Sequence, residues 1–219
     1  MFMKTKELDL NINDLEIIED FYTLAIDAKD EDLDVENKYI KDQVYSNEDF
    51  SELNFSDMIF ENCRFLECSF KKSGFVDVLF KNCDFSNSDF NEGYFSRVHF
   101  VLSKGVGADF FKSIIKDTLI KDCNFKYANF DLTSFDYVIL NESDFSNAGF
   151  SECKIRKLDI NFCKFIMSNF FKTSLKGLDF SDSFIDGIIL SDNFSEIKGA
   201  KVSEMQAMEL AKLLGIIIV

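Results

Sequence analysis

The chain repeats every five residues over most of its length. From Phe50 to Leu190, every fifth residue is Phe, Ile or Leu except at Gly105, which makes 28 of 29 positions, 20 of them Phe. A second track two residues earlier is mostly small, as at Cys63 and Ala128, and the three positions between the tracks are largely Asp, Asn, Ser, Lys and Glu. A period of five matches neither an α-helix nor a flat β-strand, so ordinary amphipathic elements are excluded.

Both tracks can point inward only if the chain turns a corner every five residues. Four corners close a square coil of about 20 residues, and stacked coils satisfy each other's backbone groups at a spacing of about 4.8 Å. The large residue then fills the axis, and the small one lies near the corner. The period therefore predicts an all-β solenoid, a quadrilateral β-helix of about seven coils over residues 46–199. Because Gly105 leaves the axis unfilled, we expect a joint near residues 101–109.

The N-terminal region, residues 1–45, lacks the five-residue period in this interpretation. Asn13 or Asp14 is a candidate N-cap for a helix whose apolar positions are Leu15, Ile18, Phe21 and Ala25. Residues 1–45 hold 13 acidic and 5 basic residues, whereas residues 46–199 hold 24 and 17. About half of the negative charge thus lies in an acidic, partly helical extension.

The C-terminal region, residues 200–219, is predicted to be a capping helix and a short strand. Ser203 and Gln206 form a capping box, and Gly215 occupies a position that favours a left-handed residue. A stack of coils has open edges that pair readily with another chain. We therefore expect a homodimer through an apolar tail consisting of Met208, Leu210, Leu213, Leu214 and Ile216.

The composition restricts the possible partners. The formal net charge is −15, which argues against direct nucleic-acid binding and favours a cationic protein partner. The alternative is that the acidity serves only solubility. The first ten residues show no signal peptide and no run of 18 apolar residues occurs, so we expect a cytoplasmic protein without a membrane span.

Two sets of outward positions are candidate contact surfaces. The first is an acidic face with Asp49, Asp89 and Asp109. Stacked carboxylates resemble a glycosidase pair, but a flat face lacks the pocket that catalysis needs, so bonding to nearby backbone amides is the favoured interpretation. The second is an apolar stripe, whose members are Ile59, Leu79, His99, Leu119 and Ile139. Such a stripe marks a contact surface, or is covered by the N-terminal extension, although the extension is expected first to cover the edge of the first coil.

The cysteines are interpreted as packing residues. The inward small positions of one face read Cys63, Cys83, Cys123 and Cys163, with Ser103, Ser143 and Ser183 between them. Ligands strung along a rod cannot converge on a tetrahedral metal, and free Cys behaves as a small buried apolar residue. Neither a metal nor a cofactor is expected, and no catalytic constellation is evident.

Several stretches resemble a known repeat consensus of a small residue, Asp/Asn, Leu/Phe and Ser/Thr. Examples are Ser88-Asp89-Phe90-Asn91, Ala128-Asn129-Phe130-Asp131 and Ser143-Asp144-Phe145-Ser146. The chain resembles the pentapeptide-repeat family, which implies a right-handed β-helix. Its Phe-rich axis and its tail from Gly199 to Gly215 are similar to the quinolone-resistance (Qnr-type) group. That resemblance implies a non-enzymatic DNA mimic that binds DNA gyrase or topoisomerase IV and dimerises through its C-terminus. The alternative is a generic interaction scaffold or immunity-type protein with a different partner.

Overall fold

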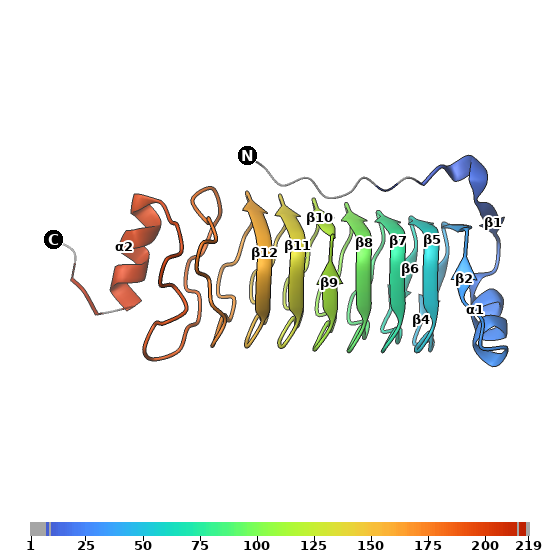
Figure 1. The fold of residues 1–219 in the computed structure, drawn as a ribbon, viewed down its shortest axis with the longest axis horizontal. Helices are drawn as coiled ribbons and strands as arrows, with labels where there is room; N and C mark the ends of the chain where they lie inside the picture. Colours follow the sequence, from blue (N-terminus) through green and yellow to red (C-terminus); the bar gives the residue numbers. More distant parts are fainter. Residues whose placement is uncertain (1–7, 9, 214, 218–219) are drawn as a thin grey trace.

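Most corners of the coil carry a residue with a positive φ, and these residues recur every five positions. Glu52, Asp57 and Asn62 are successive examples, with φ of 62°, 52° and 56°. Four such corners complete a turn, so Phe55 pairs with Phe75 in the next coil, in parallel. The computed structural model, which describes residues 8, 10–213 and 215–217, is a rod with one helix at each end (Figure 1). The predicted right-handed, four-sided solenoid of about seven coils is confirmed.

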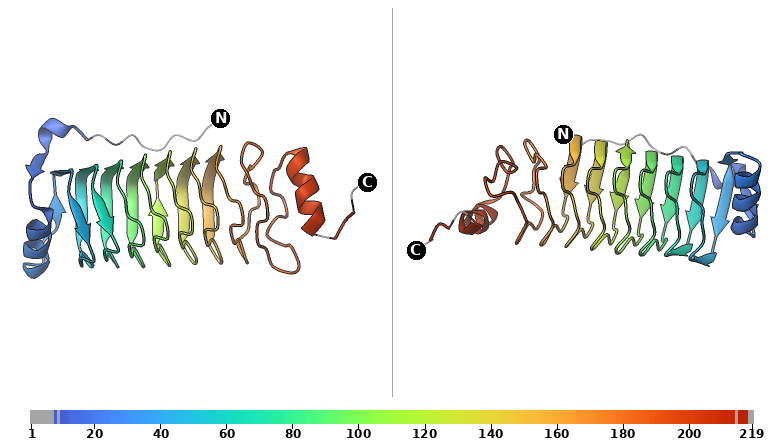
Figure 2. Two further views of the ribbon diagram at one scale, coloured as in Figure 1. Left: turned by 180° about the vertical axis from the view of Figure 1, so that it is seen from behind. Right: turned by 90° about the horizontal axis from the view of Figure 1, so that it is seen from below.

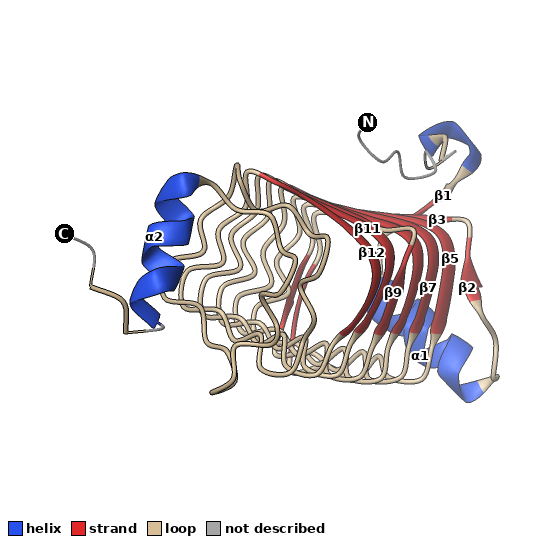
Figure 3. Cartoon of the chain, turned by 60° about the vertical axis from the view of Figure 1, so that its left-hand side comes forward, coloured by secondary structure: helices blue, strands red, loops and turns tan. Residues whose placement is uncertain are grey.

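The strands are parallel and are stacked side by side along the rod (Figure 3). Ten of them form one sheet, and β4 and β6 form a second. Long strands such as β5 and β7 contain a corner residue, so each spans two adjacent sides of the square. The strands are β1 (Glu16–Ile18), β2 (Val35–Glu36), β3 (Lys38–Lys41), β4 (Val44–Ser46), β5 (Asn54–Glu61), β6 (Arg64–Leu66), β7 (Gly74–Lys81), β8 (Tyr94–Val101), β9 (Ile114–Lys116), β10 (Leu119–Lys121), β11 (Ser134–Asn141) and β12 (Lys154–Asn161).

The axis of the rod is a set of stacked aromatic rings. Rings one coil apart lie nearly parallel, with centroids 5.1 Å apart for Phe70 and Phe90 and 5.0 Å apart for Phe110 and Phe130. The small track is buried as well, and its hydroxyls bond to the backbone: Ser88 Oγ donates to the carbonyl of Phe65 at 2.6 Å. The large and small tracks thus fill the interior together, as the sequence predicts.

The joint expected near residues 101–109 is absent from this fully described stretch. The amide of Phe85 donates to the carbonyl of Lys104 at 2.7 Å, and the amide of Gly105 donates to the carbonyl of Asn124 at 2.9 Å. A Cβ at Gly105 would collide with the ring of Phe125, which leans into the space. A ring from the next coil fills the axis, and the coil needs no bulge.

An irregularity occurs instead where β12 meets β11. Phe135 pairs with Ile155, but Asp136 pairs with Lys157, so the register shifts by one residue. Residue 157 also departs from the pattern of positive φ that its counterparts at 117 and 137 follow. The bulge is a feature of the backbone at this corner. The axial residues Ile155 and Ile160 keep their five-residue spacing, so the sequence pattern does not reveal the bulge.

The solenoid begins before residue 46, which corrects the predicted boundary. Val35 and Ile40 are buried and continue the axial track toward Phe50, and Tyr45 packs against the same core. The corner residues likewise extend back to Asp32. The predicted helix beginning at residue 13 or 14 is also wrong. Residues Ile12–Asp14 form a short 3₁₀-helix, η1, and β1 follows it.

The first helix, α1 (Phe21–Asp30), covers the open edge of the first coil (Figure 2). Asp20 caps it by accepting a hydrogen bond from the amide of Thr23 at 3.2 Å. Its buried side consists of Phe21, Ala25 and Ala28. The extension was expected to cover either the edge of the first coil or the apolar stripe, and these residues lie at the edge.

The second helix, α2 (Glu204–Leu213), covers the other end. The predicted capping box is present: the amide of Ser203 donates to Gln206 Oε1 at 2.8 Å, and the amide of Gln206 to Ser203 Oγ at 3.4 Å. Gln206 Nε2 also donates to the carbonyls of Phe180 and Ser183, which ties the helix to the last coil. Gly215 has a φ of 75°, as its position predicts. Neither helix, nor any other in the described chain, has the length and apolar character that crossing a bilayer requires.

Candidate partner-binding surfaces

The acidic face lies in one column, because Asp89 and Asp109 are paired across adjacent coils. Each of the three carboxylates accepts a bond from an amide two residues later: Asp49 from Ser51 at 2.9 Å, Asp89 from Asn91 at 2.8 Å and Asp109 from Phe111 at 3.0 Å. The favoured interpretation, that these side chains bond to nearby backbone, is confirmed. These hydrogen bonds brace the corners of the coil.

The environments of these carboxylates differ along the column. The hydrogen bonds from Ser51 lower the pKa of Asp49, and the ion pair with Lys29 at 3.0 Å acts in the same direction. Burial raises the pKa of Asp109, and the neighbouring charge of Asp89 adds to the increase. A half-buried acid with a raised pKa is a feature of some active sites. Asp109 lines neither of the two pockets described below.

A second acidic surface is present at the N-terminal end of the rod. Its six carboxylates are exposed, and none forms an ion pair with another described residue; they belong to Asp27, Asp30, Glu31, Asp32, Asp34 and Glu36. We call this surface the acidic end. It borders a pocket of about 620 Å³ that also contains Leu24 and Leu33. The excess of acidic residues in residues 1–45 predicts this surface, but only the structure shows that it is distinct from the column of Asp49, Asp89 and Asp109.

The apolar stripe forms one column of the main sheet. Ile59 pairs with Leu79, Leu79 with His99, His99 with Leu119, and Leu119 with Ile139. The column is less exposed than expected: Ile59 is only 3% exposed, and the other four residues are half-buried. The column extends to Tyr39 in β3, which is 7% exposed.

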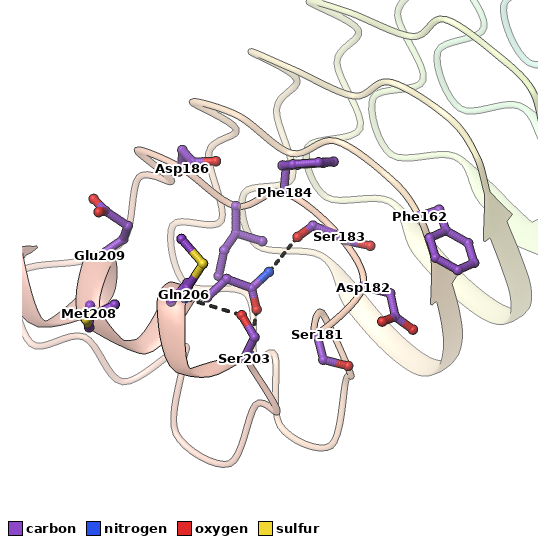
Figure 4. Close-up of a pocket in the computed structure, with 12 residues that line it drawn as sticks. Phe162, Ser181, Asp182, Ser183, Phe184, Asp186, Ser203, Gln206, Met208 and Glu209 are labelled. Carbon is purple, nitrogen blue, oxygen red and sulfur yellow. Dashed lines mark hydrogen bonds between the residues drawn. The ribbon is translucent and has the colours of Figure 1, made fainter.

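The C-terminal end carries an apolar pocket of about 540 Å³ (Figure 4). The exposed rings of Phe162 and Phe184 line it from the coils, and Met205 and Met208 line it from α2. Asp182, Asp186 and Glu209 also contribute to its lining.

The predicted dimer tail is largely exposed in the single chain. Met208 is 44% exposed, Leu213 40% and Ile216 52%. Leu210 is half-buried against the core, and Leu214 lies outside the described residues. The sequence did not point to the exposed rings of Phe162 and Phe184, because they lie outside both repeat tracks.

The cysteines are free and buried, and the predicted inward ladder is present. The Sγ of Cys123 donates to the carbonyl of Phe100 at 3.4 Å, and the amide of Cys123 donates to Ser143 Oγ at 3.0 Å. Burial raises the pKa of Cys123 to about 12 and that of Cys163 to about 11. Such thiols are neutral and weakly nucleophilic. The described residues contain no cluster of three or more metal-ligating side chains.

Two family models match the sequence. One, for pentapeptide repeats in eight copies, matches residues 49–87, and one for a pentapeptide repeat region matches residues 73–144. No curated protein matches the chain by sequence.

Solved structures match over most of the rod. Two trypsin-treated variants of QnrB1, a plasmid-mediated fluoroquinolone resistance protein, are similar to this chain. One is 22% identical with a TM-score of 0.51, covering 83% of this chain and 92% of that chain. The other is 23% identical with a TM-score of 0.52, covering 83% of this chain and 90% of that chain. At these identities, the similarity concerns the fold.

Proposed function

Because the chain is a pentapeptide-repeat protein whose fold is that of QnrB1, we propose that it is a non-enzymatic, cytoplasmic DNA mimic. In this proposal it binds a type II topoisomerase, DNA gyrase or topoisomerase IV, and modulates the enzyme or protects it from quinolones. The observation that carries the proposal is a straight rod with a net charge of −15 and a surface of unpaired carboxylates at one end. A DNA-binding channel is lined with basic residues, and it attracts such a rod over a long range.

The acidic end is proposed as the main contact with the enzyme. Its carboxylates have no ion-pair partners among the described residues, so they attract a basic surface without first breaking salt bridges. The column of Asp49, Asp89 and Asp109 is proposed as a second contact along the rod. Its carboxylates are held in fixed positions by the backbone amides, which reduces the entropy lost on binding.

The C-terminal tail is proposed to form a homodimer. Met205 and Met208 of α2 line the pocket together with the exposed rings of Phe162 and Phe184, and Leu213 and Ile216 of the same tail are exposed. Burial of this surface against a second copy would join two rods end to end. The dimer would carry an acidic end at each extremity.

A DNA supercoiling assay with purified gyrase, with and without a fluoroquinolone, tests the proposal. The protein is expected to inhibit supercoiling or to protect the enzyme at micromolar concentration. Combining Asp27→Asn, Asp30→Asn and Glu31→Gln should weaken the effect. A matched control is Glu52→Gln, Glu152→Gln and Glu209→Gln, which removes the same charge from carboxylates already paired with lysines. If both triple variants act like the unmodified protein, the acidic end is not the contact.

The acidic column is tested separately with Asp49→Asn, Asp89→Asn and Asp109→Asn. An Asn side chain can still accept the bond from the backbone amide, so the corners keep their support while the charge is lost. A weaker effect on gyrase with unchanged thermal stability would assign the column to the contact.

A second function is favoured by the uneven distribution of charge. The unpaired carboxylates concentrate at one end beside a pocket with apolar residues, and this arrangement also suits a basic, partly apolar segment of another protein. The alternative is therefore an interaction scaffold or immunity-type protein. No effect on gyrase or topoisomerase IV, together with no binding to either enzyme, would favour it.

A further inference from the structure

A groove runs along one side of the solenoid, between two columns of outward residues. Two adjoining depressions of about 350 Å³ and 360 Å³ share Leu102 and Lys104 in their linings, so they form one continuous groove. Because successive residues of an extended chain point to opposite sides, the residues before and after each small inward residue form the two rims. The small inward residues themselves form the floor, and those that line it are Cys83, Ser103, Cys123 and Ser143.

The first rim is a column of corner residues with apolar ends and an acidic middle. Over four successive coils it reads Leu102, Asp122, Glu142 and Phe162, and all four residues are exposed. Leu102 is 54% exposed and Phe162 is 60% exposed. Both have a φ of 53°, a conformation that favours Asn and Asp over bulky residues. The chain therefore holds two apolar side chains in solvent at corners that suit polar ones.

The carboxylates between these two apolar residues are open to a cationic ligand. Glu142 forms no ion pair within the described part of the chain, and Asp122 forms only a long one with Lys121, at 3.9 Å. The second rim adds Asp144, which Lys126 approaches at 3.3 Å. The middle of the groove is thus negative, and an arginine or lysine side chain is its complement.

Lysines on the second rim restrict what can bind at the ends of the groove. Lys104 lies across the floor from Leu102, and Lys164 lies across it from Phe162. Each ammonium repels a cation near the apolar residue, whereas its hydrocarbon stem adds apolar surface. The groove is therefore suited to one cation at its middle and an apolar side chain at each end.

The spacing of these features selects an extended chain. Leu102 and Phe162 are three coil steps apart, which is about 14 Å. In an extended chain, residues i, i+2 and i+4 point to one side, and the outer two lie about 13–14 Å apart. In an α-helix, side chains directly above one another lie about 10.5 Å or about 16.5 Å apart, which does not fit. Residue i+2 of an extended chain falls about 7 Å from the level of Leu102, between Asp122 and Glu142.

We propose that this groove binds an extended segment of a partner protein with the pattern apolar-x-basic-x-apolar. The two apolar side chains contact Leu102 and Phe162, and the basic side chain lies between Asp122 and Glu142. The backbone of each coil is already bonded to its neighbours, as where the amide of Leu102 donates to the carbonyl of Lys121 at 3.0 Å. Recognition is therefore through side chains, and a single segment binds weakly. This inference does not depend on binding to a topoisomerase.

A short fluorescent peptide provides the probe. Its sequence is Ser-Leu-Ser-Arg-Ser-Leu-Ser, blocked at both ends, and its fluorescence anisotropy in the presence of the full chain gives the Kd. Replacement of its Arg by Glu should weaken binding by about tenfold or more, because the central contact becomes repulsive. Moving one Leu by a single position, to the opposite side of the peptide, should have a similar effect. Added salt should weaken binding of the Arg peptide, because exposed charges are screened.

Variants of the groove have a matched control. Glu142→Lys should weaken binding of the Arg peptide by about tenfold or more, because it places a cation at the middle of the groove. Glu92→Lys alters an exposed corner half a coil away from this column, and it should leave the Kd unchanged. Leu102→Asn should weaken binding by about tenfold, because an apolar contact is lost. It should not lower Tm, because Asn82 occupies the same corner of the preceding coil with a φ of 52°.

Amide NMR signals of the isotope-labelled protein locate the bound peptide. The largest shifts should fall within residues 102–104, 122–124, 142–144 and 162–164. Largest shifts in α2 would assign the peptide to the C-terminal pocket and would overturn the proposal. Equal Kd values for the Arg and Glu peptides, equal effects of Glu142→Lys and Glu92→Lys, or no binding at millimolar peptide would also overturn it.

Discussion

The ring of Phe21 lies 5.1 Å from the ring of Phe50, so a side chain of the terminal helix continues the aromatic stack of the solenoid. Phe21 also contacts the rings of Phe55, Phe60 and Phe65. α1 is therefore a plug for the axis as well as a cover for the edge.

Replacement of Phe21 should strongly destabilise the protein. We expect Phe21→Ala to lower the free energy of unfolding by about 3–5 kcal/mol, because a fully buried aromatic ring is lost. Asp27→Ala, on the exposed side of the same helix, should change it by less than about 0.5 kcal/mol. Urea melts of the two variants provide the comparison, and similar losses would contradict the plug.

The register of the coil predicts that a phenylalanine on the axis contributes more to stability than one that faces outward. Phe130 is stacked between Phe110 and Phe150, with centroids 5.0 Å and 5.1 Å away. Phe130→Ala should cost about 3–5 kcal/mol. Phe111 faces outward beside Lys112, so Phe111→Ala should cost far less. Denaturant melts that give equal losses would refute the register.

The space at Gly105 is predicted to be occupied by its neighbour. Gly105→Ala should destabilise the protein by about 1–3 kcal/mol, because the new methyl group overlaps the ring of Phe125. The double variant Gly105→Ala with Phe125→Leu should be more stable than the sum of the two single effects predicts. A double-mutant cycle measures this coupling, and a coupling energy of zero would show that the ring does not fill the gap.

The buried thiols predict a loss of stability at high pH. The pKa of Cys123 is raised from 9.0 to about 12, so the unfolded thiol ionises first, and stability falls as pH rises from about 9 toward 12. Each such thiol contributes a slope of up to about 1.4 kcal/mol per pH unit. Cys123→Ser should reduce the slope, since Ser103 and Ser143 occupy the same column. An unchanged slope in urea melts at pH 8, 9 and 10 would contradict this assignment.

The apolar tail predicts a dimer that a single charge can disrupt. Met208→Asp should convert the dimer to a monomer in light scattering, because the residue lines the apolar pocket at the C-terminal end. Ala207→Asp, also exposed on α2, is the matched control and should leave the dimer intact. If the Met208 variant remains a dimer, the interface lies elsewhere on the rod.

The sequence predicts the solenoid well because few folds accept its two tracks. A large residue at every fifth position and a small one two places earlier both point inward only in a square coil, and the structure buries both. The Asp residues before the axial positions likewise bond to the backbone because their spacing leaves the amide two residues later within reach.

The first coil was not predicted because the positions that hold small residues elsewhere in the solenoid hold larger ones here. Gln43, two residues before Tyr45, occupies such a position. Its side chain accepts a bond from the amide of Phe21 at 3.0 Å and donates to the carbonyl of Ile18 at 2.6 Å. No coil is stacked on this side, so the crowding that requires a small residue is missing. The sequence pattern is therefore lost in the terminal coil, although this coil still belongs to the solenoid.

The joint predicted near Gly105 was wrong for a different reason. A periodic pattern treats each position as independent, whereas in the rod a ring from the next coil leans across. The candidate surfaces were harder still, because exposure depends on which segment lies over a column. The apolar column was visible in the sequence, but its burial at Ile59 was not.

The five-residue period of the chain also restricts how this rod can change in length. An insertion of 20 residues would add about 4.8 Å and leave every outward column in line. An insertion of five residues between Asp89 and Asp109 would keep the axial phenylalanines on the axis, yet it would rotate all later columns by a quarter turn and separate Asp109 from Asp89. A partner that contacts two distant points on one column would tolerate the first change and reject the second, although both variants keep the same core.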